Sequence, residues 1–192
     1  MRARLLEATV DCLVERGFAH TSTTLVSERA GVSRGAQLHH FPAKNDLVVA
    51  AVEHLTEVRG AELAAAAARL PSGKRRTRAV LQMLADHFTG PVFTAALELW
   101  VAARTDEALL AEVAPLEQKV GRDTHRLTVE LLGADETRPG VRELVQATLD
   151  LVRGLGLANT ISDDAPRRSR ILDRWALTLD ATLAAPDTRG RL

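Results

Sequence analysis

Hydroxyl and basic side chains gather between positions 22 and 44 in a pattern suited to holding phosphate groups. Ser22, Thr23 and Thr24 precede one short segment with helical apolar spacing, and Ser33 and Arg34 precede the next. The free N–H groups and the positive dipole end of a helix start attract phosphate oxygens, and hydroxyl and guanidinium groups there add donors. The pattern therefore predicts contacts with a phosphate backbone.

A tight turn separates the two short helices that this pattern predicts, residues 22–30 and 34–41. Gly31 supplies the left-handed residue that ends the first helix, Val32 packs inward, and Ser33 caps the second helix. A three-residue turn containing glycine between two helices is typical of the helix-turn-helix, whose second helix enters the major groove of DNA. An ordinary αα corner has the same turn, so these residues alone leave both interpretations open.

Four groups of residues around this turn keep a characteristic order and spacing over the first 50 positions. They are Leu5-Leu6 with Ala8 and Leu13 before Gly17-Phe18, then Ala30 to Gly35, then His40-Phe41-Pro42, and Lys44 to Leu47. In these residues the chain resembles the TetR family of transcriptional regulators. The segment Glu98 to Asp106 is also similar to one found in a branch of that family. The resemblance implies a DNA-binding head of three helices followed by a helical lobe.

The resemblance also implies roles for residues on and beside the second helix of the motif. Its first residues, Arg34 to Ala36, should approach base edges, and Gly35 lets the helix start sit close to DNA because it lacks Cβ. His39 and His40 should touch the backbone or neighbouring bases, and Lys44 matches a lysine that grips a phosphate. The candidate DNA contacts are Ser22, Thr23, Thr24, Ser33, Arg34, Gly35, Ala36, Gln37, Leu38, His39, His40 and Lys44.

Two departures from the family pattern leave alternatives open. Gln37-Leu38 stands where an apolar residue followed by tyrosine is common, so the usual contact of tyrosine with phosphate cannot exist. Leu38 either touches a thymine methyl group or packs. Gln37 either reads an adenine through paired hydrogen bonds or lies against the core near Phe41, its i+4 neighbour. Ala43 stands where a capping serine is frequent, which leaves Asn45 as the expected cap of the next helix.

The elements that must position these residues are helices throughout. Apolar residues recur at three- and four-residue spacing along the chain, and no stretch alternates in the manner of a β-strand. Glycines and prolines divide the chain into about eight or nine helices. The sequence therefore predicts an all-α fold with a helix-turn-helix DNA-binding domain over residues 1–46 and a helical effector-binding and dimerisation domain over residues 47–192.

The larger lobe contains an aromatic stripe that suggests where an effector binds. Phe93, Leu97, Trp100 and Arg104 lie at i, i+4, i+7 and i+11 on one face of a predicted helix. Such a stripe also occurs as plain core, and Arg104 can pair with a neighbouring acid instead of an anionic ligand. The expected effector is an amphipathic aromatic or lipid-like molecule. Its candidate contacts are Met83, His87, Phe88, Phe93, Leu97, Trp100 and Arg104.

The resemblance further implies a homodimer, and geometry supports it independently. One three-helix head contacts few bases, whereas two heads about 34–36 Å apart read the two halves of a palindrome. The predicted interface uses the last two long helices, Val141 to Asn159 and Arg167 to Leu183, in a four-helix bundle with their mates. The alternative is that these faces pack only within the monomer.

Composition excludes several other classes. The chain has 192 residues and equal numbers, 25 and 25, of basic and acidic side chains, although residues 1–45 hold six basic against four acidic. No metal-binding, phosphate-loop or nucleophile motif converges, so we expect no cofactor, no metal and no enzymatic activity. Neither a signal peptide nor a membrane span is apparent, which predicts a cytoplasmic protein.

These observations favour a dimeric repressor that a small-molecule effector releases from a palindromic operator. An activator, or a repressor that needs no ligand, would have the same sequence features. The alternative from another class is a helical small-molecule-binding module or enzyme of the same fold that does not bind DNA, which the neutral overall charge and the missing tyrosine favour.

Overall fold

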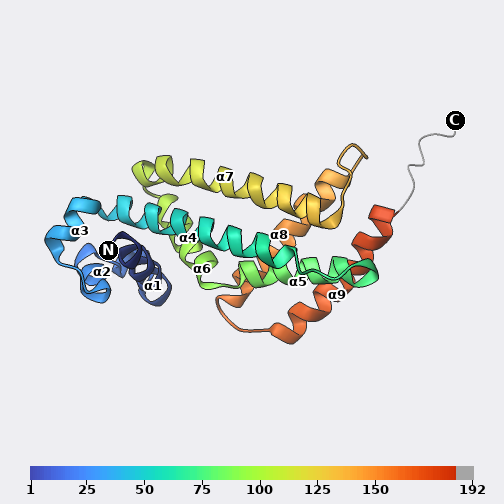
Figure 1. Cartoon of the computed structure of the whole chain (residues 1–192), viewed down its shortest axis with the longest axis horizontal. Coiled ribbons are helices and arrows are strands. Elements are labelled where there is room, and N and C mark those ends of the chain that lie inside the picture. The colour runs from blue at the N-terminus through green and yellow to red at the C-terminus, as the bar shows by residue number, and fades with distance from the viewer. Residues whose placement is uncertain (185–192) are drawn as a thin grey trace. The chain divides into compact units, whose positions relative to one another are not determined.

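The structure, a computed structural model, describes residues 1–184 and is entirely helical over that range, apart from turns and loops. The described helices are α1 (Arg2–His20), α2 (Thr23–Ala30), α3 (Arg34–His40), α4 (Lys44–Ala67), the 3-10 turn η1 (Gly73–Arg75), α5 (Arg76–Phe88), α6 (Pro91–Ala103), α7 (Glu107–Leu132), α8 (Val141–Asn159) and α9 (Ala165–Ala184) (Figure 1). The predicted all-α fold is confirmed. Residues 185–192, the end of the range predicted for the second domain, lie outside the described residues.

The helices form two compact units, each with its own core. The first contains Met1–Ala61 and Gly90–Val120, and the second contains Glu62–Thr89 and, among the described residues, Gly121–Ala184. Two of the three boundaries fall within the long helices α4 and α7, and the third falls in the turn between α5 and α6. None of the described helices combines the length and the apolar character needed to cross a bilayer.

In the first unit, α1 packs against α2 and α6, and α1, α2 and α3 lie together beside the start of α4 (Figure 1). Leu6, Thr9 and Leu13 form an inward stripe of α1 and are fully buried. Leu99 of α6 is 1% exposed and joins the same core. Burying a leucine side chain stabilises a fold by about 1.5–3 kcal/mol, so this stripe fixes the position of α1 against its neighbours.

In the second unit, α5 packs against α8 and α9. One face of α8 is buried, at Val141, Val145, Thr148, Val152 and Leu155. Thr148 is the polar member of this face and has partners for its hydroxyl group. That hydroxyl donates to its own helix at the Leu144 carbonyl, 2.8 Å away, and accepts the indole N–H of Trp175 of α9 at 3.0 Å. This face therefore holds α8 to the rest of the unit.

The last two helices agree closely with their predicted bounds. α8 spans Val141–Asn159 as predicted, whereas α9 begins at Ala165, two residues before the predicted start at Arg167. Asp164 accepts the backbone N–H of Arg167 at 3.2 Å and so caps α9. Proline fits the first turn of a helix because it has no N–H to leave unpaired, which explains the earlier start.

Candidate nucleic-acid interface

The turn between α2 and α3 has the geometry that its residues predict. Gly31 adopts the left-handed conformation, with φ 62° and ψ 39°, and its N–H bonds back to α2. Val32 is buried, and its N–H donates to the Ser27 carbonyl at 3.0 Å. Ser33 accepts the backbone N–H of Ala36 at 3.3 Å and so caps α3. The turn thus fixes the direction in which α3 leaves α2.

Ser22 caps α2 in the same manner, because its hydroxyl oxygen accepts the Leu25 N–H at 3.2 Å. In both caps the hydroxyl oxygen is the acceptor, so the O–H of Ser22 and that of Ser33 can still donate to another group. Both serines and Thr24 are exposed, and Thr23 is half-buried. The two helix starts therefore present hydroxyl donors together with backbone N–H groups.

The exposed face of α3 contains the residues that could meet base edges. Arg34, Gly35 and Leu38 are exposed, and Leu38 keeps 44% of its surface accessible although it is apolar. His39 and His40 are exposed as well, and Ala36 is half-buried. The exposed face of α3 thus offers the guanidinium of Arg34, the bare backbone of Gly35 and the apolar side chain of Leu38.

Gln37 points into the core, which decides between the two alternatives that the sequence leaves open. Its side chain has no exposed surface. The amide Nε2 donates to the carbonyl of Phe41 at 2.5 Å and so ties down the end of α3, while Oε1 is buried without a hydrogen-bond partner among the described residues. Gln37 therefore packs near Phe41, as one alternative predicted, and is not available to an adenine in this conformation.

The start of α4 is capped by a different residue from the expected one. Asn45 lies inside α4 and the prediction that it caps the helix is wrong. Instead, Asp46 accepts the backbone N–H of Ala43 at 3.2 Å. A carboxylate at the third helical residue that accepts the N–H of the N-cap residue is one half of a capping box, and Ala43 cannot supply the other half because it has no side-chain acceptor.

Lys44, the first residue of α4, is held by the end of α1. Its ammonium donates to the Phe18 carbonyl at 2.6 Å and lies 4.0 Å from the centre of the Phe18 ring. Burial lowers the pKa of Lys44 from its ordinary value, because the charged form loses hydration. An ammonium group has three donors, so the Phe18 carbonyl does not use all of them.

The backbone N–H of Phe18 is also hydrogen-bonded to another helix. Its N–H donates to Oε2 of Glu98, on α6, at 3.1 Å. Gly17, just before it, has φ 74° and ψ 170°, a conformation in which α1 breaks and turns. A Cβ on Gly17 would lie 2.9 Å from the same Glu98 oxygen. The end of α1 is therefore tied to α4 by Lys44 and to α6 by Glu98.

A bidentate ion pair braces α1 against α2. Arg29 Nη1 and Nη2 lie 2.5 and 2.6 Å from the two carboxylate oxygens of Glu15, and its Nε lies 3.4 Å from Asp11. The hydrogen bonds from Arg29 lower the pKa of the Glu15 carboxyl group. Arg29 therefore holds α2 against α1 through these ion pairs.

The predicted effector contacts are divided between the two units. Phe93, Leu97, Trp100 and Arg104 belong to the first unit, where the buried Phe93 and half-buried Trp100 meet edge to face with ring centres 5.9 Å apart. Met83, His87 and Phe88 belong to the second. Trp100 packs against the core of the first unit, and Arg104 is exposed at the end of the stripe.

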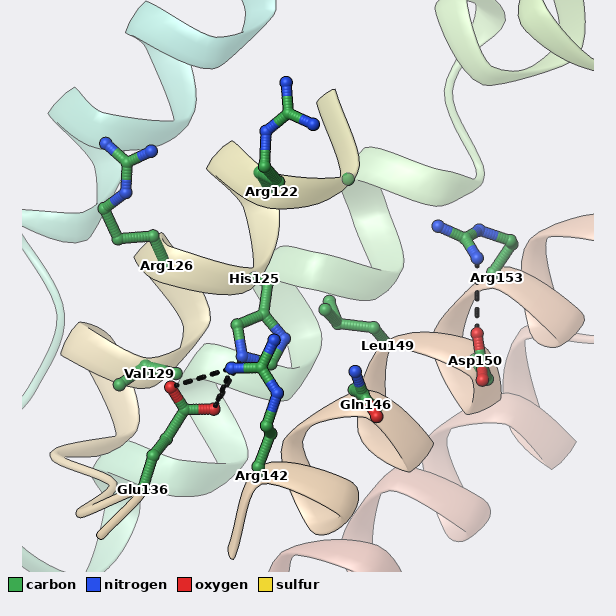
Figure 2. A pocket seen from close by; sticks show the side chains of 11 residues that line it. Arg122, His125, Arg126, Val129, Glu136, Arg142, Gln146, Leu149, Asp150 and Arg153 are labelled. Carbon is green, nitrogen blue, oxygen red and sulfur yellow. Dashed lines mark hydrogen bonds and ion pairs between the residues drawn. The ribbon is translucent and has the colours of Figure 1, made fainter. Parts of the chain in front are cut away.

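A cavity that the sequence did not point to lies in the second unit, between the C-terminal half of α7 and α8. Its volume is about 580 Å³. Polar and charged side chains line most of it, as Figure 2 shows. The lining residues are Gly121, Arg122, His125, Arg126, Val129, Glu136, Arg142, Gln146, Leu149, Asp150 and Arg153.

Comparison with known proteins agrees with the helix-turn-helix geometry. The family model described as bacterial regulatory proteins, tetR family, matches residues 5–51. The HTH-type transcriptional regulator CymR of Pseudomonas putida is 31% identical over 176 residues, which cover 88% of this chain and 84% of CymR. The chain belongs to the tetR family of bacterial regulatory proteins. It is therefore a DNA-binding transcriptional regulator and not an enzyme, as the sequence predicted.

Solved structures of other regulators share the fold of this TetR-family protein. A transcriptional regulator of Rhodococcus sp. Rha1 superposes with a TM-score of 0.76 at 22% identity, covering 97% of this chain and 99% of the other. A regulator of Saccharomonospora viridis, solved in complex with choline, has a TM-score of 0.71 at 16% identity, covering 94% and 93% of the two chains. At these identities the likeness concerns the fold.

Sequence reasoning missed two features of this TetR-family protein. The hydrogen bond from the Phe18 N–H to Glu98 joins residues 80 positions apart, and nothing in the neighbouring sequence indicates that they meet. The α7–α8 cavity has a weak signal, because Arg122 and Arg126 stand four residues apart on one helix and Arg142 and Arg153 share a face of the next. His125, which looks isolated in sequence, lies within this group of arginines.

Proposed function

We propose that this TetR-family protein is a dimeric repressor that binds a palindromic operator through α3 and leaves it when a small molecule binds the C-terminal lobe. The observation that carries the proposal is the capped, exposed start of α3 with Arg34 and Gly35 on its outer face. A regulator of this kind works in the cytoplasm, where bacterial DNA lies.

The DNA-binding domain in this proposal is residues 1–46. Arg34, Gly35, Ala36 and Leu38 approach base edges, while the hydroxyl groups at the starts of α2 and α3 hold phosphates. Gln37 contributes by fixing the end of α3. The proposed phosphate and flanking contacts are Ser22, Thr23, Thr24, Ser33, His39, His40 and Lys44.

Residues 47–192 form the effector-binding and dimerisation domain in this proposal. The choline complex of the Saccharomonospora viridis regulator supports a lobe that holds small molecules, because that protein has the same fold. The half-buried Trp100 at the end of the α6 stripe gives a direct test. Its fluorescence should change when an effector that releases DNA is added, and no response to such an effector would remove the α6 stripe from the binding site.

The proposed dimer forms through α8 and α9, whose outer faces expose large apolar side chains. Leu157 of α8 is 52% exposed, Leu177 of α9 is 61% exposed, and Ile161 in the loop between them is 89% exposed. Large apolar side chains exposed to water favour association where they meet a partner surface. Ile161→Glu should shift the protein from dimer to monomer in analytical ultracentrifugation, while Val101→Glu, at the 60% exposed Val101 of α6, should leave the dimer intact. Equal sedimentation of both variants would contradict this interface.

Selection of bound duplexes from a random DNA pool, at two salt concentrations, tests the DNA-binding proposal. We expect a palindrome whose half-sites are one helical turn or a multiple of it apart. The affinity should fall with salt, with a logarithmic slope of about −0.9 for each phosphate neutralised. A folded dimer that enriches no sequence would favour the second candidate, a small-molecule-binding module that has lost DNA binding.

A further inference from the structure

The α7–α8 cavity combines a size suited to a small molecule with an unusual concentration of arginine. Its volume of about 580 Å³ lies within the range of about 300–1,000 Å³ typical of ligand pockets. Two helix faces build it. The α7 face presents Arg122, His125, Arg126 and Val129, and the α8 face presents Arg142, Gln146, Leu149, Asp150 and Arg153. Glu136 enters from the loop between the helices.

The charges on this lining are unequal, since four arginines face two carboxylates. Glu136 accepts a 2.7 Å hydrogen bond from His125 and lies 3.5 Å from Arg142. Asp150 lies 3.2 Å from Arg153 (Figure 2). The lining acids therefore neutralise at most two of the arginines, and the cavity retains positive charge.

The remaining two arginines are differently engaged. Arg126 lies 3.0 Å from Asp123 on its own helix, outside the cavity lining, and its side chain is 76% exposed. Ion pairs this exposed contribute about 0–1 kcal/mol, so an anion can draw Arg126 away at small cost. Arg122 has no ion pair with any acid of the described residues, and Figure 2 shows its side chain, like that of Arg126, extending away from Arg142. Both side chains are at the surface, so they can turn toward a bound anion.

Arg142 also makes only a weak contact with its acidic neighbour, Glu136. It lies 3.5 Å from both Glu136 oxygens, at the limit of a hydrogen bond, and it is 58% exposed. A carboxylate or phosphate can receive two parallel N–H donors from one guanidinium at about 2.7–2.9 Å, which is a stronger arrangement. Val129 and Leu149 give the cavity an apolar wall, and Leu149 is 7% exposed. An apolar body can therefore lie against these two side chains while its anionic group meets the arginines.

We propose that the α7–α8 cavity binds a small organic anion, with its carboxylate or phosphate held by Arg142 and by Arg122 and Arg126 once these two side chains turn toward it, and with its apolar body against Val129 and Leu149. Binding itself does not depend on the proposed repressor function. A regulatory effect of such binding rests on that function.

The test compares two probes that differ by one sulfonate group: the anion 8-anilinonaphthalene-1-sulfonate and the uncharged N-phenyl-1-naphthylamine. Fluorescence titration of the full chain should give one sulfonate-dependent site per chain, with the uncharged probe at least tenfold weaker. Benzoate and phenyl phosphate should then displace the anionic probe, and the better competitor identifies which anionic group the arginines prefer. Equal binding of both probes, or failure of both competitors, would overturn the proposal.

Variants locate the site. Arg122→Gln combined with Arg142→Gln should weaken binding of the anionic probe at least tenfold. Arg69→Gln combined with Arg170→Gln removes the same charge from two exposed arginines of the second unit and should leave binding within about twofold. Arg122→Gln alone breaks no ion pair of the described residues, so it tests the site without disturbing packing. Equal affinity in the two double variants would refute the assignment.

Operator binding by the same proteins separates the two proposals. If the wild-type protein binds the anionic probe at this site but enriches no DNA, the cavity assignment stands and the repressor proposal fails. If it binds DNA but the affinity for the anionic probe is unchanged in the Arg122 and Arg142 double variant, the cavity assignment fails and the DNA-binding proposal stands.

Discussion

Replacing Gly17 by alanine should destabilise the first unit by about 2–5 kcal/mol. Two effects add. The backbone at Gly17, with φ 74° and ψ 170°, lies in a region that is essentially restricted to glycine, and a side chain there costs about 1–3 kcal/mol. The new Cβ would also lie 2.9 Å from Oε2 of Glu98 and would push that carboxylate away from the Phe18 N–H. Losing a partly exposed hydrogen bond to a charged acceptor costs about a further 1–2 kcal/mol.

Urea unfolding followed by circular dichroism, at one fixed protein concentration, measures this change. Gly35→Ala is the matched control, because Gly35 lies within α3 and a Cβ there meets nothing within 4 Å. Alanine should stabilise that helix by about 0.5–1 kcal/mol relative to glycine. A Gly17→Ala protein within about 0.5 kcal/mol of the wild type would refute the reasoning about both the backbone and Glu98.

A double-variant cycle separates the two effects. In a Glu98→Ala background the carboxylate that the new Cβ would displace is gone, so only the backbone cost of Gly17→Ala should remain. The destabilisation by Gly17→Ala should then fall by about 1–2 kcal/mol. If it stays the same, the contact with Glu98 does not contribute.

Four further predictions concern single side chains. Arg34→Ala should weaken operator binding by about 1–3 kcal/mol in a gel-shift titration, and an unchanged dissociation constant would remove Arg34 from the contacts. Gly35→Ala should lower operator affinity while folding is kept, since its Cβ would meet DNA. Cys12 is fully buried and burial raises the pKa of its thiol, so Ellman's reagent should label it only as the protein unfolds; labelling of the folded protein within seconds would contradict this. Glu15→Gln should lower the melting temperature at pH 7, and the difference from wild type should shrink below about pH 4. The reason is that the pKa of Glu15 is lowered in the folded protein, so its carboxylate stabilises the fold above its ordinary pKa and loses that effect as acid protonates it. A difference in melting temperature that does not depend on pH would argue against the ion pair.

Local signals predicted the parts of the head that depend on neighbouring residues. The caps by Ser22 and Ser33 and the left-handed Gly31 follow from residues within three or four positions of each other. The sequence could not decide whether Gln37 contacts a base or packs in the core. The answer depends on which side of α3 the other helices cover, and the residues of α3 alone do not show that. Asn45 was chosen as a cap because asparagine favours that position, whereas the actual capping group, Asp46, binds backwards to Ala43.

Features that join distant segments were beyond the sequence. The Glu98 carboxylate reaches the Phe18 N–H only because α1 packs against α6, and periodicity does not say which helices touch. The α7–α8 cavity arises in the same way, because its arginines lie on two different helices and their spacing along the chain does not show that these helices lie side by side.

The placement of the aromatic residues gives each unit its own optical reporter. The chain contains two tryptophans and no tyrosine, so tryptophan dominates its fluorescence. Trp100 belongs to the first unit, beside Phe93, and Trp175 belongs to the second, where its indole N–H bonds to Thr148. Trp175→Phe therefore leaves an emission that follows the first unit alone, and Trp100→Phe leaves one that follows the second. The two spectra can tell whether a ligand or denaturant acts on one unit before the other.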